Sequence, residues 1–199
     1  MYDEAYACRY EQPKLVEQNR RYADRFFGDR PRGRLLEVGC GTGQFLRRLN
    51  ELGFETYGAE VSPALASYAR DLTVHVGPFE KMPSIWRPAW FDYVVTFHIL
   101  EHLVEPVPAV VKIARLLKPG GMWFNYMPNV RARHNQPPNP KWYHFNPGNP
   151  EEHINFFDSD TIRLLAEKAG LEVYAEGAEN DDFWIEARPT AAVPSGVAA

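Results

Sequence analysis

The sequence predicts a single α/β domain with a seven-stranded, mostly parallel sheet, helices on both faces and an antiparallel last strand. Short apolar runs alternate with helical patterns along the chain, which is typical of a parallel sheet with crossover helices. The last two apolar runs are too close together for a helical crossover, so they should pair antiparallel. With 199 residues, 45% of them hydrophobic, the chain can bury one sizeable core but not two.

The individual elements follow from apolar runs and from helix start and stop signals. Seven runs are predicted to be strands: 35–38, 56–60, 73–76, 91–97, 122–127, 171–176 and 183–188. Helical patterns cover residues 14–27, 44–52, 63–71, 106–117 and 158–169. Ser62 and Asp158 are suited to cap two of these helices, because their side-chain oxygens can accept backbone N–H groups. The run Lys118-Pro119-Gly120-Gly121 predicts a helix stop followed by a turn.

The domain is expected to span residues 1–188, with two segments placed to act on a substrate. Residues 1–30 are predicted to form an N-terminal helical lid, and residues 128–152 a long substrate-side loop rich in Pro, Asn and aromatic residues. Residues 189–199 are predicted to be a disordered tail. Aromatic residues in the first two segments could cover an acceptor or simply pack on the sheet, and both interpretations remain open: Tyr2, Tyr6, Tyr10, Trp142, Tyr143 and Phe145.

Composition narrows the possible functions. The net charge is -4, which argues against a nucleic-acid-binding surface because binding phosphates requires clustered Lys and Arg. Cys8 and Cys40 are far apart and form neither a disulfide framework nor a metal-binding spacing. The N-terminus lacks the apolar region of a signal peptide, and no run approaches the roughly 20 apolar residues of a spanning helix. A cytoplasmic protein that contacts no membrane is therefore expected.

The strongest functional signal is the run Leu35-Leu36-Glu37-Val38-Gly39-Cys40-Gly41-Thr42-Gly43. An apolar strand leads into a turn with glycines at alternating positions and then into a helix. Glycines there allow positive φ angles and let a ligand lie against bare backbone. Dinucleotide-binding domains carry G-x-G-x-x-G, whereas the third glycine here comes one place early. Glu60 ends the second predicted strand, close to the spacing expected for an acid that binds a ribose.

This pattern resembles the class I, Rossmann-like S-adenosylmethionine-dependent methyltransferases, of the broad small-molecule group. The resemblance extends from about Leu35 to Arg188 and includes the run Leu116-Leu117-Lys118-Pro119-Gly120-Gly121. It implies S-adenosyl-L-methionine as cofactor, with Glu37 near its cationic methionine end and Glu60 at its ribose. Pro78 stands where an acid is common in the family, which leaves adenine recognition to neighbouring groups. The expected cofactor-binding residues are Glu37, Gly39, Cys40, Gly41, Gly43, Glu60, Val61, Phe79, Glu80 and Phe97.

A second signal is His98-Ile99-Leu100-Glu101-His102, which follows the fourth predicted strand. The string matches the H-x-x-E-H of some zinc proteases, but a sheet edge is the wrong context for that fold. It also resembles the E-x-x-E-H of ubiquinone-pathway and small-RNA O-methyltransferases, which bind a divalent metal there, and His153 resembles a later metal-binding histidine of the small-RNA enzymes. No metal is assigned, and whether His98, Glu101, His102 and His153 hold one stays open. His98 and His153 are the expected catalytic bases.

The predicted function is transfer of a methyl group from S-adenosylmethionine to an O or N atom of a small-molecule acceptor. No Asn/Asp-Pro-Pro-Tyr follows the fourth strand, so methylation of nucleobase amines is not expected. Two alternatives remain: a nicotinamide-dependent oxidoreductase, which the glycine spacing disfavours, and a non-catalytic relative that binds the cofactor only. The identity of the acceptor and the oligomeric state do not follow from the sequence.

Overall fold

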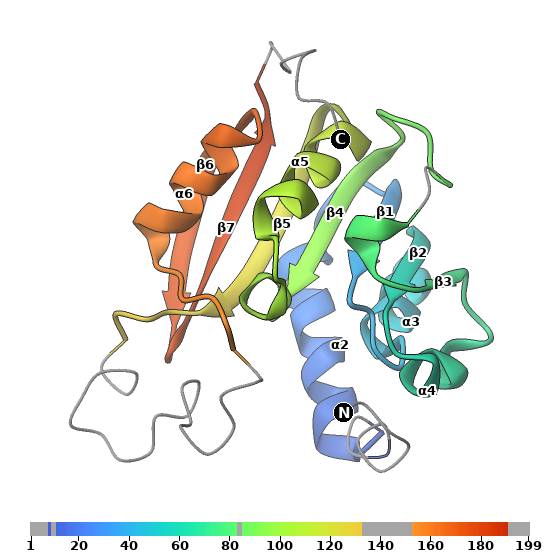
Figure 1. Ribbon diagram of the computed structural model, residues 1–199. Coiled ribbons are helices and arrows are strands. Elements are labelled where there is room, and N and C mark those ends of the chain that lie inside the picture. Colours follow the sequence, from blue (N-terminus) through green and yellow to red (C-terminus); the bar gives the residue numbers. More distant parts are fainter. Residues whose placement is uncertain (1–7, 9–10, 83–84, 133–152, 191–199) are drawn as a thin grey trace. The chain divides into compact units, whose positions relative to one another are not determined.

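A seven-stranded mixed sheet forms the framework of the protein, of which the computed structural model describes residues 8, 11–82, 85–132 and 153–190 (Figure 1). The strands are hydrogen-bonded in the order β3-β2-β1-β4-β5-β7-β6. Strand β2 runs parallel to both β1 and β3, whereas β7 runs antiparallel to both β5 and β6. The predicted sheet, with its antiparallel last strand, is confirmed.

The element bounds lie close to those predicted. The strands are β1 (Arg34–Val38), β2 (Glu55–Glu60), β3 (Val74–Val76), β4 (Phe91–Phe97), β5 (Leu117–Pro128), β6 (Leu171–Glu179) and β7 (Asp182–Pro189). The described helices are α2 (Pro13–Phe27), α3 (Gln44–Glu51), α4 (Pro63–Ala66), α5 (Pro106–Leu116) and α6 (Ser159–Lys168). Short 3-10 helices follow β2, β3 and β4 and are η1 (Ser67–Ala69), η2 (Phe79–Lys81) and η3 (Leu100–His102).

Two predicted elements were wrong in detail. The helix predicted over 63–71 is α-helical only to Ala66 and continues as η1. The Arg47 guanidinium donates to the Tyr68 carbonyl and holds Asp71 in an ion pair, so these side-chain bonds fix the last turn in place of further α-helical bonds. The turn predicted at residues 118–121 lies inside β5, which already begins at Leu117 and contains Gly120 in a left-handed conformation.

The chain divides into two compact units, Met1–Val95 and Thr96–Ala199. In the first unit, helices α2 and α3 lie side by side (Figure 1). The Phe27 ring makes edge-on contacts with the rings of Phe45, Phe54 and Tyr93, at centroid distances of 5.8, 6.1 and 5.8 Å. Each such pair contributes about 0.5–1.5 kcal/mol beyond the burial of its area. These ring contacts hold α2 against α3, which follows the glycine turn after β1, and against the chain at Phe54 and Tyr93.

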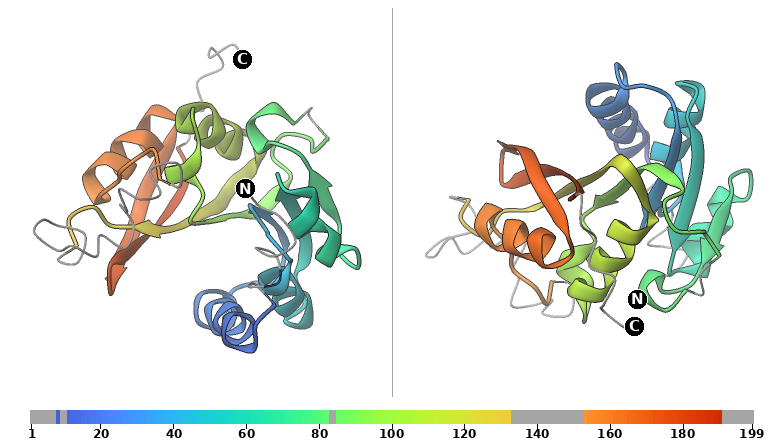
Figure 2. Two further views of the ribbon diagram at one scale, coloured as in Figure 1. Left: turned by 60° about the horizontal axis from the view of Figure 1, so that its bottom comes forward. Right: turned by 90° about the horizontal axis from the view of Figure 1, so that it is seen from above.

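The second unit is built on β5, β6 and β7, with α5 and α6 lying side by side (Figure 2). Strand β5 is buried from Gly121 to Pro128, and Trp123 and Tyr126 are among the largest fully buried side chains. The Trp123 indole donates to the Thr96 hydroxyl, which in turn donates to Asn125 Oδ1, each over 2.9 Å. These two buried hydrogen bonds join the end of β4 to β5.

Several predicted features lie outside the described residues. These are the aromatic residues Tyr2, Tyr6, Tyr10, Trp142, Tyr143 and Phe145, residues 133–152 of the predicted substrate-side loop and residues 191–199 of the predicted tail. The tail begins later than predicted, because Pro189 is the last residue of β7. Among the helices that the structure describes, none is long and apolar enough to cross a membrane.

Candidate functional site

The glycine turn after β1 has the backbone conformation that its sequence predicts. Gly39, Gly41 and Gly43 have φ angles of 75°, 54° and 82°, in the left-handed region that favours glycine. A Cβ on Gly43 would also lie only 2.5 Å from Leu72 Cδ1, so this position has no room for a side chain. The amides of Gly39 and Cys40 both donate to the Ala59 carbonyl, which ties the turn to β2.

Two buried carboxylates, Glu37 at the end of β1 and Glu60 at the end of β2, flank this turn. Each residue is only 5% exposed. Glu60 is held by backbone amides, because Oε2 accepts from Gly41 N and Oε1 from Ser62 N, each over 2.8 Å. Glu37 Oε2 is buried and accepts no hydrogen bond from the described residues. An acid with an unsatisfied oxygen therefore lies beside a second acid.

The protonation of these groups follows from their burial. Burial raises the pKa of Glu37 well above its usual range, and the nearby Glu60 charge raises it further. Burial also raises the pKa of Glu60, although the amides of Ser62, Gly41 and Val61 act to lower it. The Cys40 thiol has a strongly raised pKa for the same reason, burial beside both acids. A ligand that brings positive charge would stabilise the ionised carboxylates.

The other residues predicted to bind the cofactor are distributed over both units. In the first unit, Val61 follows Glu60 and is half exposed, Phe79 is buried in η2, and Glu80 beside it is partly exposed. The Gly77 amide donates to the Glu60 carbonyl over 2.8 Å, which ties the chain before η2 to β2. Phe97 belongs to the second unit, where its ring contacts those of Phe124 and Tyr126.

In the second unit, His98 follows β4 in a strained conformation. Its φ angle of 51° is unusual for a residue with a side chain, and its amide donates to the Tyr126 carbonyl over 2.9 Å. The imidazole is 39% exposed, and its Nδ1 lies 3.4 Å from Glu101 Oε1. Desolvation acts to lower the pKa of His98, but Glu101 and the more distant Asp182 raise it by more, so the net pKa is raised.

Glu101, in η3, is the buried acid of this unit. Its side chain is 3% exposed, and neither carboxylate oxygen accepts a hydrogen bond from the described residues. Burial acts to raise the pKa of Glu101, yet the His98 and His102 imidazoles lower it by more, and the net pKa is lowered. Glu101 is therefore a buried carboxylate beside histidine side chains, with a pKa below its ordinary value.

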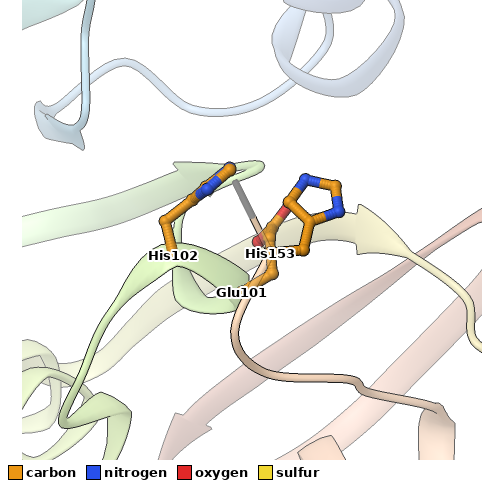
Figure 3. A group of neighbouring side chains, drawn as sticks. All are labelled: Glu101, His102 and His153. Atoms are coloured by element: carbon orange, nitrogen blue, oxygen red, sulfur yellow. The ribbon is translucent and has the colours of Figure 1, made fainter. Parts of the chain in front are cut away.

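His102 and His153 complete a cluster with Glu101 (Figure 3). One ligand atom from each of the three residues lies within 4.8 Å of the others, and the two imidazole rings are 4.7 Å apart. The main chain fixes this arrangement, since the amides of Ile154 and Asn155 both donate to the Glu101 carbonyl. The structure thus brings predicted residues about fifty positions apart in the chain into one cluster.

Sequence reasoning missed Asn155, which secures this cluster. Its side-chain amide donates to the Leu103 carbonyl over 2.5 Å and to the Leu100 carbonyl over 3.3 Å. These bonds fasten the segment that carries His153 to both ends of η3. A polar residue between Ile154 and Phe156 was the available signal, but its partners lie more than fifty positions away in the chain.

Comparison with known proteins assigns a family to this arrangement. Residues 9–176 match the family described as "Methyltransferase domain", which covers most of the chain. The chain belongs to this methyltransferase family. It is a class I, S-adenosylmethionine-dependent methyltransferase, as the glycine turn and the two strand-end acids predict.

Curated relatives of this methyltransferase match about half of its length. A ubiquinone biosynthesis O-methyltransferase of Xanthomonas campestris pv. campestris is 33% identical over 47% of this chain and 42% of its own. A protein of the same name from Alkalilimnicola ehrlichii is 35% identical over 44% of this chain and 38% of its own. The matched region is thus less than half the length of either relative.

Solved structures share the fold over nearly the whole methyltransferase. One is a putative methyltransferase of Haloferax volcanii, solved in complex with the Trm112 methyltransferase activator. It has a TM-score of 0.76 and 18% identity, over 94% of this chain and 97% of its own. Another is a methyltransferase of Thermotoga maritima described as a possible histamine N-methyltransferase. Its TM-score is 0.72 at 20% identity, over 94% of this chain and 98% of its own.

Proposed function

We propose that this methyltransferase transfers the methyl group of S-adenosylmethionine to a hydroxyl oxygen of a small-molecule acceptor. The observation that carries the proposal is the buried pair Glu37 and Glu60 at a left-handed glycine turn. Both acids have raised pKa values, so a cationic ligand would gain from ionising them. S-adenosylmethionine is such a ligand, because its amino group and its sulfonium are both positively charged.

The cofactor contacts are proposed residue by residue. Glu37 would face the methionine amino group, since its Oε2 accepts no hydrogen bond from the described residues. Glu60 would accept the ribose hydroxyls through its remaining lone pairs, while Gly41 and Ser62 hold it in place. The bare backbone of Gly39, Cys40, Gly41 and Gly43 would lie against the cofactor, with Val61, Phe79 and Glu80 contributing contacts. Phe97, in the second unit, remains a prediction from the sequence.

Oxygen is the favoured target because the curated relatives are named as ubiquinone biosynthesis O-methyltransferases. The reaction is an in-line displacement in which the methyl carbon leaves sulfur and bonds to the acceptor oxygen. The sulfonium becomes a neutral thioether, and the acceptor loses its proton. His98 or His153 would take that proton, since an imidazole nitrogen can act as a general base.

The resemblance to metal-binding O-methyltransferases also implies a divalent ion near these histidines. The residues present fit one, because both Glu101 oxygens are buried and accept no hydrogen bond from the described part of the chain. One of them also lies within 4.8 Å of donor atoms on His102 and His153. When bound, such an ion would lower the pKa of an acceptor hydroxyl. Glu101 would hold it through charge, and His98 would orient that carboxylate.

Thermal unfolding with S-adenosylmethionine, its demethylated product and NAD in parallel tests the cofactor assignment. A ligand at about 100 times its dissociation constant should add roughly 2.7 kcal/mol to the free energy of unfolding. Stabilisation by both sulfur nucleosides but not by NAD supports the proposal, whereas stabilisation by NAD alone contradicts it. Phenols, catechols and hydroxyquinones offered with methyl-labelled cofactor then test the acceptor class, and label found only on amines would contradict O-methylation.

A further inference from the structure

We propose that Glu101, His102 and His153 bind a transition-metal ion of the zinc class, and that His98 stays outside its coordination sphere. The role of this ion in methyl transfer rests on the proposed function, whereas its binding does not.

The geometry brings three suitable donor atoms to one point. Glu101 and His102 come from η3, and His153 reaches them from the segment that leads to α6 (Figure 3). Zinc–nitrogen and zinc–oxygen bonds are about 2.0–2.2 Å long, so two ligand atoms of one tetrahedral ion lie about 3.3–3.6 Å apart. The ligand atoms here lie within 4.8 Å of one another, so small rotations of the half-buried imidazoles would close the site.

Glu101 supplies an independent observation that points to a cation. The carboxylate is almost fully buried, and neither oxygen accepts a hydrogen bond from the described residues. A buried charge is costly unless it is paired or coordinates a metal. The 3.4 Å contact with His98 engages Oε1 only weakly, since it exceeds an ordinary charge-assisted hydrogen bond of about 2.7–2.9 Å. Oε2 therefore remains available for an ion.

The donor set decides which ion fits. Magnesium and calcium prefer sites made of carboxylates, carbonyls and water, whereas imidazole suits zinc, iron, copper and nickel. The cluster contains two imidazoles and a single carboxylate. In the resembling E-x-x-E-H pattern a further acid stands at the place of His98, and that exchange removes a hard oxygen donor. The substitution thus shifts the preference of this chain from magnesium toward zinc-class ions.

His98 acts on the ion only through Glu101. Its Nδ1 faces a carboxylate oxygen, and it does not belong to the group of mutually close ligand atoms. Carboxylates that bind metals are commonly oriented by such outer partners. Three protein ligands leave a coordination position open, as in catalytic zinc sites, and an acceptor oxygen could occupy it. His153 is then a ligand of the metal, and His98 remains as the proton acceptor of the reaction.

Metal binding by the purified full chain tests the inference without cofactor or acceptor. The chain is stripped with a chelator and dialysed separately against zinc, cobalt and magnesium chloride, and bound metal is measured by mass spectrometry. We expect about one equivalent of zinc or cobalt and no retained magnesium. The visible absorption of bound cobalt should report a low-coordinate site with nitrogen and oxygen ligands.

Single substitutions distinguish the proposed metal ligands from His98, which contacts the ligand Glu101 and not the metal. Glu101→Gln and His153→Asn should each weaken zinc binding by more than about 100-fold, because loss of an outer partner alone costs roughly 10–100-fold. His98→Gln should fall within that smaller range and keep the stoichiometry and the cobalt spectrum. His75→Asn, which removes a histidine of β3 in the first unit, is the matched control and should bind zinc like the wild type.

Three results would overturn the inference: no stoichiometric zinc binding, retention of magnesium in preference to zinc, or zinc binding unchanged in both ligand variants. Circular dichroism and thermal unfolding confirm that each variant is folded. Should a variant fail to fold, competition between zinc and magnesium on the wild-type chain still decides the metal class. Binding of S-adenosylmethionine is measured separately, so failure of the proposed function would leave a positive metal result standing.

Discussion

Glu37 in the first unit and Glu101 in the second are both buried acids that follow or end a strand of the sheet, yet their pKa values move in opposite directions. Burial acts to raise both. Glu37 lies beside another acid, Glu60, whereas Glu101 lies between two imidazoles. The neighbours therefore decide whether a buried carboxylate holds a proton or a charge. The first acid is suited to a cation brought by a ligand, whereas the second has two imidazoles beside it.

The largest expected effect comes from the histidines of the second unit. Replacing both His98 and His153 with Ala should lower turnover by about 100- to 10,000-fold, the range that positioned acid–base groups contribute. Cofactor affinity should stay nearly intact, because the acids assigned to the cofactor are in the first unit. Turnover is followed as labelled methyl transferred to the acceptor found in the screen, and affinity by calorimetry. Unchanged turnover would mean that neither histidine takes part.

The second largest effect is expected on cofactor binding, when the proposed ribose contact in the first unit is removed. Glu60→Ala should weaken S-adenosylmethionine binding by about 10- to 150-fold, corresponding to the roughly 1.5–3 kcal/mol of hydrogen bonds to a charged group. Calorimetric titration measures this loss, with Glu55→Ala at the exposed start of β2 as control. Equal affinity of Glu60→Ala and the wild type would refute the ribose assignment. Zinc binding by the second unit should not change.

Glu37 gives a prediction for the dependence of stability on pH. Its pKa is higher in the folded than in the unfolded chain, so its contribution to stability is fully present below the unfolded pKa and is lost as pH rises through the folded value. Glu37→Gln should therefore unfold at higher urea than the wild type at neutral pH without cofactor, and the gap should close toward pH 4. Each unit of raised pKa corresponds to about 1.4 kcal/mol.

The same variant should bind S-adenosylmethionine more weakly, because the neutral amide cannot pair with the cofactor's amino group. A higher stability of Glu37→Gln together with a lower affinity for S-adenosylmethionine would indicate that this carboxylate is kept for binding the cofactor and not for stabilising the fold. Should Glu37→Gln be less stable than the wild type at every pH, the carboxylate would have a structural role instead.

The smallest expected effect concerns helix caps, one in each unit. Asp158 accepts from the Thr161 amide over 2.8 Å and caps the ten-residue helix α6, whereas Ser62 accepts from the Leu65 amide over 3.3 Å at the four-residue helix α4. Asp158→Ala should lower the free energy of unfolding by about 1 kcal/mol, and Ser62→Ala by less. Urea unfolding at neutral pH measures both, and an equal or larger loss for Ser62→Ala would contradict this ranking.

Much of the first unit could be predicted from the sequence because its signals are local. The glycine turn places Glu37 two residues before its first glycine, and the cap at Asp158 in the second unit is likewise read from adjacent residues. These features depend on backbone preferences and on strand ends, which short stretches of sequence encode.

The cluster around Glu101 could be predicted only as a list of candidate residues. Which imidazole contacts which carboxylate depends on the bonds from Asn155 to Leu103 and from Ile154 to Glu101, which join segments about fifty residues apart. Similarly, Arg47 ends the α-helical part of α4 through a bond to Tyr68, although helix propensity favours continuation. Side-chain partners at such separations leave no periodic pattern in the sequence.

The left-handed backbone at His98 has a consequence for any effort to make this enzyme more robust. A side chain in that conformation costs roughly 1–2 kcal/mol, a cost that glycine avoids. A library screened only for heat resistance would therefore enrich glycine at position 98. The selected variants would be more stable to heat but would lack the imidazole that faces Glu101. Such a screen should therefore be combined with a selection for methyl transfer.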